Sequence, residues 1–271
     1  MNILLPSLNR YYKEMMSLEG KLFVLDSFIK NFQNDLLIKE IFDRELMSSI
    51  SAFSDLSQFT DENNLYNTGY NYSLDSSTLT SEIEIILSKE YCLILSQAYE
   101  IFETYLLNIF TELLFAIPDH LVTLNLLEVK LHLPKKSLRD YVKNKIGRPK
   151  NNRKYISSLR KLSKHFKEHE TKNIYNLNIS VWFDLITELR HNIIHNRQVI
   201  SNNLLEFLKE KERAKLFEQF FERKTTYDGV VIFMTNEKFH INLNRLNEFA
   251  YFIFKSLSTD NNFDSTYKLA E

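Results

Sequence analysis

Residues 81–117 read SEIEIILSKEYCLILSQAYEIFETYLLNIFTELLFAI and are followed by Pro118. Ser81 and Glu84 have the spacing of a capping box, which marks the start of a helix, and proline cannot continue one. Between these limits apolar residues recur every three or four positions, the period of a helix with one buried face. The stretch therefore predicts a helix about 50 Å long. The residues expected on its buried face are Leu87, Tyr91, Ile94, Ala98, Ile101, Phe102, Tyr105, Ile109 and Leu113.

The composition favours other long helices around this one. The chain has only four Gly and four Pro among 271 residues, so few positions call for tight turns. Its 44% hydrophobic content is ample for a buried core. The sequence therefore predicts an all-α helical bundle and not a many-stranded sheet.

The remaining patterns divide the chain into four parts. Apolar residues at helical spacing over 17–56 predict two helices in an N-terminal helical extension, residues 1–60. The polar stretch 61–80 is predicted to be a linker, residues 81–257 a helical domain, and 258–271 a tail.

Within the helical domain, further helices are expected over 179–198 and 203–224, with a closing helix from Leu246 to Leu257. Asp228-Gly229 is typical of a turn, Val230–Phe233 is apolar, and Phe239–Leu243 alternates. The two segments together predict one small C-terminal β-hairpin.

The single cysteine, Cys92, has no partner for an intrachain disulfide, which favours a reducing compartment. The chain begins without a signal-peptide pattern, and no run approaches the length of a membrane span. We therefore expect a soluble protein of the cytoplasm.

Charge is distributed unevenly along the chain. Residues 130–167 contain fourteen Lys or Arg and one acid, Asp140, whereas the whole chain has a net charge of −1. A block of one sign attracts polyanions, although a solvated lysine-rich face is the alternative interpretation. The predicted nucleic-acid-binding residues of this block are Lys135, Lys136, Arg139, Lys143, Arg148, Lys150, Arg153 and Lys154.

The helix predicted over 179–198 has two distinct faces at 100° per residue. Trp182, Leu185, Ile186, Leu189 and Ile193 form a core stripe, and Asp184, Glu188, His191 and His195 lie opposite. Arg190 and Ile194 fall between the two faces. An isoleucine off the core stripe suits a self-associating surface, so Ile194 is predicted to lie at a dimer interface.

Residues 190–196 of this helix read RHNIIHN, which is Arg, four residues, His and then Asn. This pattern resembles the signature of the HEPN family of helical ribonucleases and nucleotide-binding domains. Residues 99–106, YEIFETYL, are similar to a Phe- and Glu-rich helix found early in such domains. The resemblance covers about residues 81–257. One departure is that Arg197 stands where many members have glycine.

The resemblance implies a metal-independent endoribonuclease, with no cofactor, that acts as a homodimer. A histidine that titrates near neutral pH can transfer protons during RNA cleavage, and an arginine fork can stabilise the phosphate charge. His195 and Arg190 are assigned these roles, with His191 and Asn192 orienting groups or contacting RNA and Glu103 as a partner for Arg190. The family also implies a toxin or antiphage defence effector with an antitoxin or other defence partner. The alternative is a non-catalytic module that binds RNA or a nucleotide, or an interaction subunit.

Two competing patterns are weaker. A second Arg-x4-His match, Arg160 to His165, lacks the aliphatic interior and the trailing Asn. His191 and His195, like His165 and His169, have the i, i+4 spacing that can share a metal ion. Asn192 stands where a metalloprotease helix carries glutamate, and a di-iron site would need a second Glu-x-x-His helix. The residues Glu237 to His240 have that spacing but are predicted to lie in the hairpin, so we predict no metal site.

Overall fold

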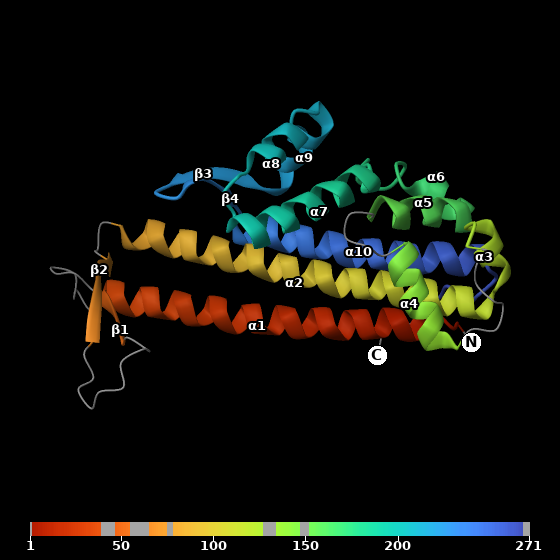
Figure 1. The fold of residues 1–271 in the computed structure, drawn as a ribbon, viewed down its shortest axis with the longest axis horizontal. Helices are drawn as coiled ribbons and strands as arrows, with labels where there is room; N and C mark the ends of the chain where they lie inside the picture. Colours follow the sequence, from red (N-terminus) through yellow and green to blue (C-terminus); the bar gives the residue numbers. More distant parts are fainter. Residues whose placement is uncertain are drawn as a thin grey trace. The chain divides into compact units, whose positions relative to one another are not determined.

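The computed structural model describes residues 2–38, 47–54, 65–74, 78–126, 134–146 and 152–267. The chain divides into two compact units, one of residues 1–20 with 89–271 and one of residues 21–88. The predicted helical bundle with a small C-terminal hairpin is confirmed (Figure 1). The helices are α1 (Leu5–Ile38), α2 (Leu79–Ala116), α3 (Asp119–Thr123), α4 (Lys135–Lys145), α5 (Asn152–Leu162), α6 (Lys164–His169), α7 (Ile179–Asn196), α8 (Asn202–Phe207), α9 (Lys211–Phe220) and α10 (Asn236–Asp260). The strands are β1 (Met47–Ser54), β2 (Leu65–Leu74), β3 (Glu222–Thr226) and β4 (Gly229–Phe233).

The core of the larger unit is an aromatic cluster between α2, α7 and α10, which lie along one another in Figure 1. The ring of Phe102 on α2 stacks on Phe249 of α10 at a centroid distance of 5.2 Å and meets Phe183 of α7 edge-on at 5.5 Å. The hydroxyl of Tyr105 donates to the carbonyl oxygen of Ala250 over 2.8 Å. Aromatic pairs in these arrangements add to the energy of apolar burial. This cluster holds α7 against α2, the spine helix of the bundle.

The first twenty residues belong to the same unit. The amide of Asn2 donates to Ser258 Oγ and to the carbonyl oxygen of Asp264, both over 2.7 Å. Tyr11 packs against Phe102 and donates from its hydroxyl to Asn247 Oδ1. The start of α1 therefore completes the helical bundle.

The smaller unit differs from the prediction. Residues 17–56 were expected to form two helices and 61–80 a linker, but α1 is one helix and the next described elements are β1 and β2, an antiparallel pair. The polar residues that predicted a loop are compatible with a strand pair, because its backbone bonds do not depend on apolar side chains. At the start of α2, Leu79 and Ile83 are buried, and Ile29 of α1 packs against them.

The C-terminal hairpin is present and Val230–Phe233 is one of its strands, but the partner strand was assigned wrongly. The strand β4 pairs with β3, which precedes it, and Tyr227 and Asp228 form the turn. Residues 239–243 lie instead in α10, because Thr235 caps that helix by accepting from the Lys238 backbone N–H. The predicted helix over 203–224 is two helices, α8 and α9.

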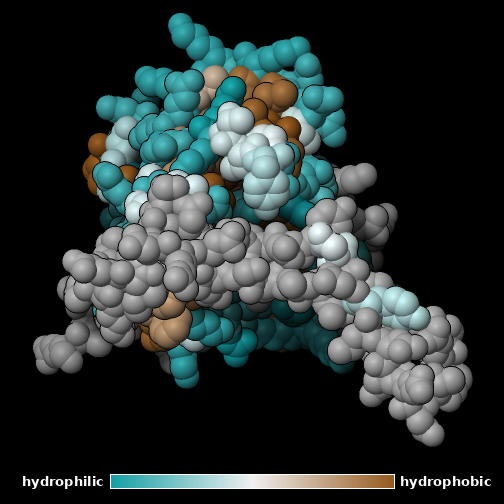
Figure 2. Space-filling view, turned by 90° about the vertical axis from the view of Figure 1, so that its left-hand side faces the viewer, coloured by the Kyte–Doolittle hydropathy of each residue, from teal (hydrophilic) through white to brown (hydrophobic). Residues whose placement is uncertain are grey.

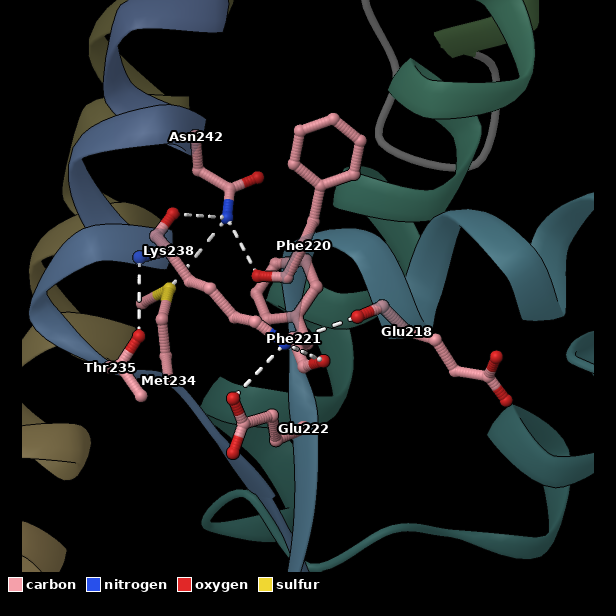
Figure 3. A network of polar contacts seen from close by, with 8 residues as sticks. All are labelled: Glu218, Phe220, Phe221, Glu222, Met234, Thr235, Lys238 and Asn242. Atoms are coloured by element: carbon pink, nitrogen blue, oxygen red, sulfur yellow. Dashed lines mark hydrogen bonds and ion pairs between the residues drawn. The ribbon is translucent and has the colours of Figure 1, made fainter.

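A polar network fastens the hairpin to α10 (Figure 3). The ammonium group of Lys238 donates to the carbonyl oxygens of Glu218 and Phe221 over 3.1 and 2.9 Å, and it pairs with Glu222 at 3.1 Å. The fully buried amide of Asn242 donates to the Phe220 carbonyl over 3.1 Å. These bonds occupy the backbone carbonyls where α9 ends and β3 begins, and so fix the base of the hairpin.

Among the described residues, no helix combines the length and apolar character needed to cross a bilayer. Apolar groups nevertheless reach the surface among hydrophilic ones, as the brown and teal areas of Figure 2 show. The exposed apolar side chains of the larger unit include Leu93, Ile194, Tyr227 and Val230.

Candidate active site

The helix α7 forms as predicted and carries the Arg-x4-His motif near its carboxyl end. It begins after Asn178, whose side chain accepts from the backbone N–H of Val181. The predicted core stripe is buried along its whole length. The opposite face, which carries Asp184, Glu188, His191 and His195, reaches solvent. We call it the free face of α7.

His191 and His195 lie side by side on that free face, and both are exposed. Their ring centroids are 4.5 Å apart, as the i, i+4 spacing of a helix requires. A single chain therefore presents two neighbouring imidazoles to solvent. A pair of this kind can supply one group that accepts a proton and one that donates it.

Arg190 lies beside the histidines but is tied to α2. Its Nη2 donates to Oε1 of Glu100 over 2.6 Å, and its Nε is buried without a hydrogen-bond partner among the described residues. Tyr99 lies close by, and burial raises the pKa of its phenol well above the usual value. The charge of Glu103 adds to that rise and the charge of Arg190 opposes it. The guanidinium therefore contacts Glu100 and acts, together with the charge of Glu103, on the Tyr99 phenol.

Asn192, predicted to orient groups or contact RNA, is buried and bonded within the chain. Its amide donates to the carbonyl oxygen of Val199 over 2.8 Å, and its Oδ1 accepts from the Ser201 backbone N–H over 3.2 Å. With an exposed fraction of 1%, the side chain cannot reach a substrate. Asn192 is therefore a positioning residue that holds the turn after α7.

That turn contains two consecutive residues in the left-handed backbone region. Arg197 has φ of 50° and Gln198 has φ of 69°. Such angles favour glycine, yet an arginine and a glutamine adopt them here. Gln198 is anchored by its amide, which donates to the Lys89 carbonyl over 3.1 Å, and its own carbonyl accepts from Ile232 of β4. The end of α7 is thereby joined to both α2 and the hairpin.

A groove of about 560 Å³ opens at this junction. Lys89 and Leu93 of α2 form one wall, Ile194 and Arg197 another, and Tyr227 at the hairpin turn closes it. The Tyr227 ring is 85% exposed and the Lys89 ammonium lies 5.9 Å from its centroid. A free aromatic face with nearby cations is suited to stacking a nucleobase next to a phosphate.

The described contacts of α4, which carries part of the basic segment, lie away from this site. Lys135 on α4 pairs with Glu112 at 2.5 Å, and Arg139 donates to Asn108 over 3.4 Å, both near the carboxyl end of α2. Glu112 is twelve residues beyond Glu100, which is about 18 Å along a helix. Lys136, Lys143 and Lys154 are exposed. Arg148 and Lys150 lie outside the described residues, and the structure describes only the backbone of Arg153.

The second Arg-x4-His match is occupied by structural contacts. Arg160 Nε donates to both carboxylate oxygens of Glu170 over 2.8 and 2.9 Å, and His165 Nδ1 bonds Ser256 Oγ at 3.0 Å. Burial lowers the pKa of His165, and the charge of His169 lowers it further. The two side chains are therefore held by different partners, Glu170 in the loop after α6 and Ser256 on α10.

The described residues contain no group of three or more His, Cys, Asp or Glu side chains arranged to hold a metal ion. Residues 237–240 lie on α10, so their predicted place in the hairpin was wrong. Each histidine pair thus offers two ligands at most within the described part of the chain.

Sequence reasoning missed Glu100, Lys89 and Tyr227. The only signal for Tyr227 was its place beside Asp228-Gly229, where a tight turn exposes a side chain. Glu100 and Lys89 could not be chosen over other charged residues of α2 without the pairing of helices.

Comparison with known proteins finds no family model, curated protein or solved structure that matches this chain.

Proposed function

We propose that this chain is a metal-independent endoribonuclease whose reacting groups are His195, His191 and Arg190. The observation that carries the proposal is the exposed histidine pair on α7, with 4.5 Å between ring centroids, next to an arginine of the same helix. The likeness of residues 190–196 to the HEPN signature supports the same assignment.

RNA carries its own nucleophile, the ribose 2′-OH next to the scissile phosphate. One imidazole accepts the 2′-OH proton while O2′ attacks phosphorus, and a protonated imidazole gives a proton to the departing O5′. The products are a 2′,3′-cyclic phosphate and a 5′-OH. Each proton transfer typically contributes about 10² to 10⁴-fold. We assign one of these transfers to His195 and the other to His191.

Arg190 is assigned to the phosphate, whose charge grows in the transition state. A guanidinium fork matches two phosphate oxygens, and its bond to the exposed carboxylate of Glu100 is of a kind that costs about 1 kcal/mol or less to open. The groove beside Tyr227 and Arg197 would hold the adjacent nucleotide.

The proposal includes a homodimer in which the exposed Ile194, a lining residue of this groove, meets its two-fold copy, so that the partner chain would form part of the nucleotide site. A two-fold contact brings the same patch from each chain together and would place two motifs around one RNA. The HEPN resemblance favours such a dimer and a role as a toxin or antiphage defence effector with an antitoxin or other defence partner.

The test is incubation of the purified chain with 5′-labelled RNA in EDTA. We expect fragments that end in 2′,3′-cyclic phosphate, and no cleavage of the same oligonucleotide with 2′-deoxyribose throughout. His195→Ala and Arg190→Ala should each lower the rate by at least about 100-fold. The matched control is His240→Ala, another exposed histidine, on α10.

Intact RNA under all conditions, or a fully active His195→Ala protein, would overturn the assignment. RNA that binds tightly but stays uncut would favour the alternative, a non-catalytic RNA-binding module. The bond between Arg190 and Glu100 supports this alternative, because it occupies a guanidinium donor that a catalytic arginine would offer to the phosphate.

A further inference from the structure

A second hollow lies at the other end of α7. Its volume is about 400 Å³, and it is enclosed by α6, the loop of residues 170–178, the start of α7 and the middle of α10. Ile179, Trp182 and Phe249 are buried side chains that line it, and Phe252 and Tyr175 add two more apolar faces. The cavity is therefore large enough for a small organic molecule and is aromatic in character.

The charge around this cavity is net positive. Lys172 and Lys255 line it and are exposed, and neither forms an ion pair with an acid among the described residues. His165 and His169 add two imidazoles with ring centroids 4.4 Å apart. Glu248 is the one acid among the lining residues. An anion in the cavity would thus meet two ammonium groups, one from the loop and one from α10.

The single carboxylate is already neutralised. Glu248 accepts from the guanidinium of Arg245 over 2.6 Å and from the hydroxyl of Tyr175 over 2.7 Å. The same guanidinium lies 3.5 Å from the centroid of the Tyr175 ring. Asn173 orders the loop that carries Tyr175, because its Oδ1 accepts from the backbone N–H groups of Tyr175 and Leu177. The wall is therefore built by specific contacts, which is expected of a site formed before its ligand arrives.

Two buried donors at the cavity lack acceptors. Trp182 is 0% exposed, and its Nε1 has no hydrogen-bond partner among the described residues. The Nε of Arg245 is likewise buried and has no hydrogen-bond partner among the described residues. Buried polar groups are nearly always satisfied, and an unsatisfied one is costly. Both belong to side chains that line the cavity, and both atoms are covered by protein, so the ligand contacts proposed below are those of the ring faces and of the lysines.

We propose that this cavity is a binding site for a small organic anion. Its ring or chain would pack against Trp182 and Phe252, and its phosphate or carboxylate group would lie between Lys172 and Lys255. Thirteen residues of α7 separate Trp182 from His195, about 20 Å along the axis. The site is thus distinct from the proposed ribonuclease centre and does not depend on it.

The test uses a matched pair of probes on the full chain, 8-anilinonaphthalene-1-sulfonate and its uncharged analogue N-phenyl-1-naphthylamine. Trp182 is the only tryptophan of the protein, so energy transfer from it reports a probe bound nearby. We expect saturable binding of the sulfonate at one site per chain, tighter than that of the analogue. Displacement by phenyl phosphate or by benzoate then distinguishes the two anionic groups.

Lys172→Glu and Lys255→Glu should each weaken binding of the sulfonate about five-fold and leave the analogue unchanged. The control is Lys167→Glu, an exposed lysine of α6 that does not line the cavity. Cooperative thermal unfolding of each variant verifies the fold. Absence of sulfonate binding, equal affinity for both probes, or an equal loss in the control would overturn the proposal.

Discussion

Arg190 of α7 and Glu100 of α2 form an ion pair between two helices of the candidate site, with 2.6 Å between Nη2 and Oε1. The glutamate side chain is 55% exposed, whereas the arginine side chain is 24% exposed. Water therefore screens the carboxylate more than it screens the guanidinium. Within the proposed function, Glu100 competes with a phosphate for the same donors.

We expect Glu100→Gln to tighten RNA binding about two- to five-fold, because the variant removes one negative charge and frees the guanidinium. Fluorescence anisotropy with labelled RNA measures the change. Glu206→Gln is the matched control, since Glu206 forms a similar exposed pair with Lys209 at 2.6 Å. Weaker RNA binding by Glu100→Gln alone would contradict competition between carboxylate and phosphate.

Asn192→Ala should lower the free energy of unfolding by about 2 to 3 kcal/mol, because it leaves a buried carbonyl and a backbone N–H without their partner. Urea denaturation followed by circular dichroism gives the value.

Arg197→Gly should instead be neutral or raise stability by up to about 1 kcal/mol, since glycine adopts a φ of 50° without strain. A loss of stability in Arg197→Gly similar to that of Asn192→Ala would show that the arginine side chain, and not the backbone, holds the turn.

Ile194→Glu should convert the proposed homodimer to a monomer and abolish RNA cleavage, because a carboxylate would be buried at the contact. Light scattering coupled to size-exclusion chromatography reports the mass. The control is Leu205→Glu, because Leu205 on α8 and Ile194 have the same exposed fraction of 42%. A wild-type monomer with full activity would place the whole catalytic centre within one chain.

The pKa of His165 lies below 6.5, because burial and the nearby charge of His169 disfavour its protonated form. At a pH between the lowered pKa of the folded protein and the ordinary pKa of the unfolded chain, the unfolded chain binds more protons at His165. The free energy of unfolding therefore declines as the pH falls below about 6.5. The other charges around the ring are those of Asp260, Lys255 and Glu168. An NMR titration should give a midpoint below 6.5 for His165, and His169→Gln should raise it. A midpoint above 6.5 would show that Asp260 dominates.

The helices α2 and α7 could be predicted from the sequence because their apolar stripes are strong local signals, whereas α1 was expected to be two helices. The capping pattern at Ser81 and the stop at Pro118 mark α2 within two residues. The strands β1 and β2 could not be predicted, since their register comes from pairing between segments and not from apolar alternation within either. Phe239–Leu243 was predicted as a strand for a related reason. A short alternating run does not by itself distinguish a strand from a helix, and the capping role of Thr235 was not recognised.

The candidate site was predictable only in part. Helical projection places His191 and His195 on the face opposite the core and Ile194 beside that face, and all three are exposed. The same projection could have placed Asn192 in the core, because it follows the buried Leu185 by seven residues and Leu189 by three. The bond from Arg190 to Glu100 depends on how α7 packs on α2, which no local pattern encodes.

Cys92 lies at the middle of the spine helix with an exposed fraction of 0%, and burial raises the pKa of its thiol to about 12. A thiol in that state hardly reacts at neutral pH, since the thiolate is the nucleophile. A cysteine introduced by Tyr227→Cys would therefore take up a maleimide dye alone, at the rim of the groove. Over longer times Cys92 would be modified only when α2 separates from its neighbours. The rate of its modification would therefore report how often the bundle opens.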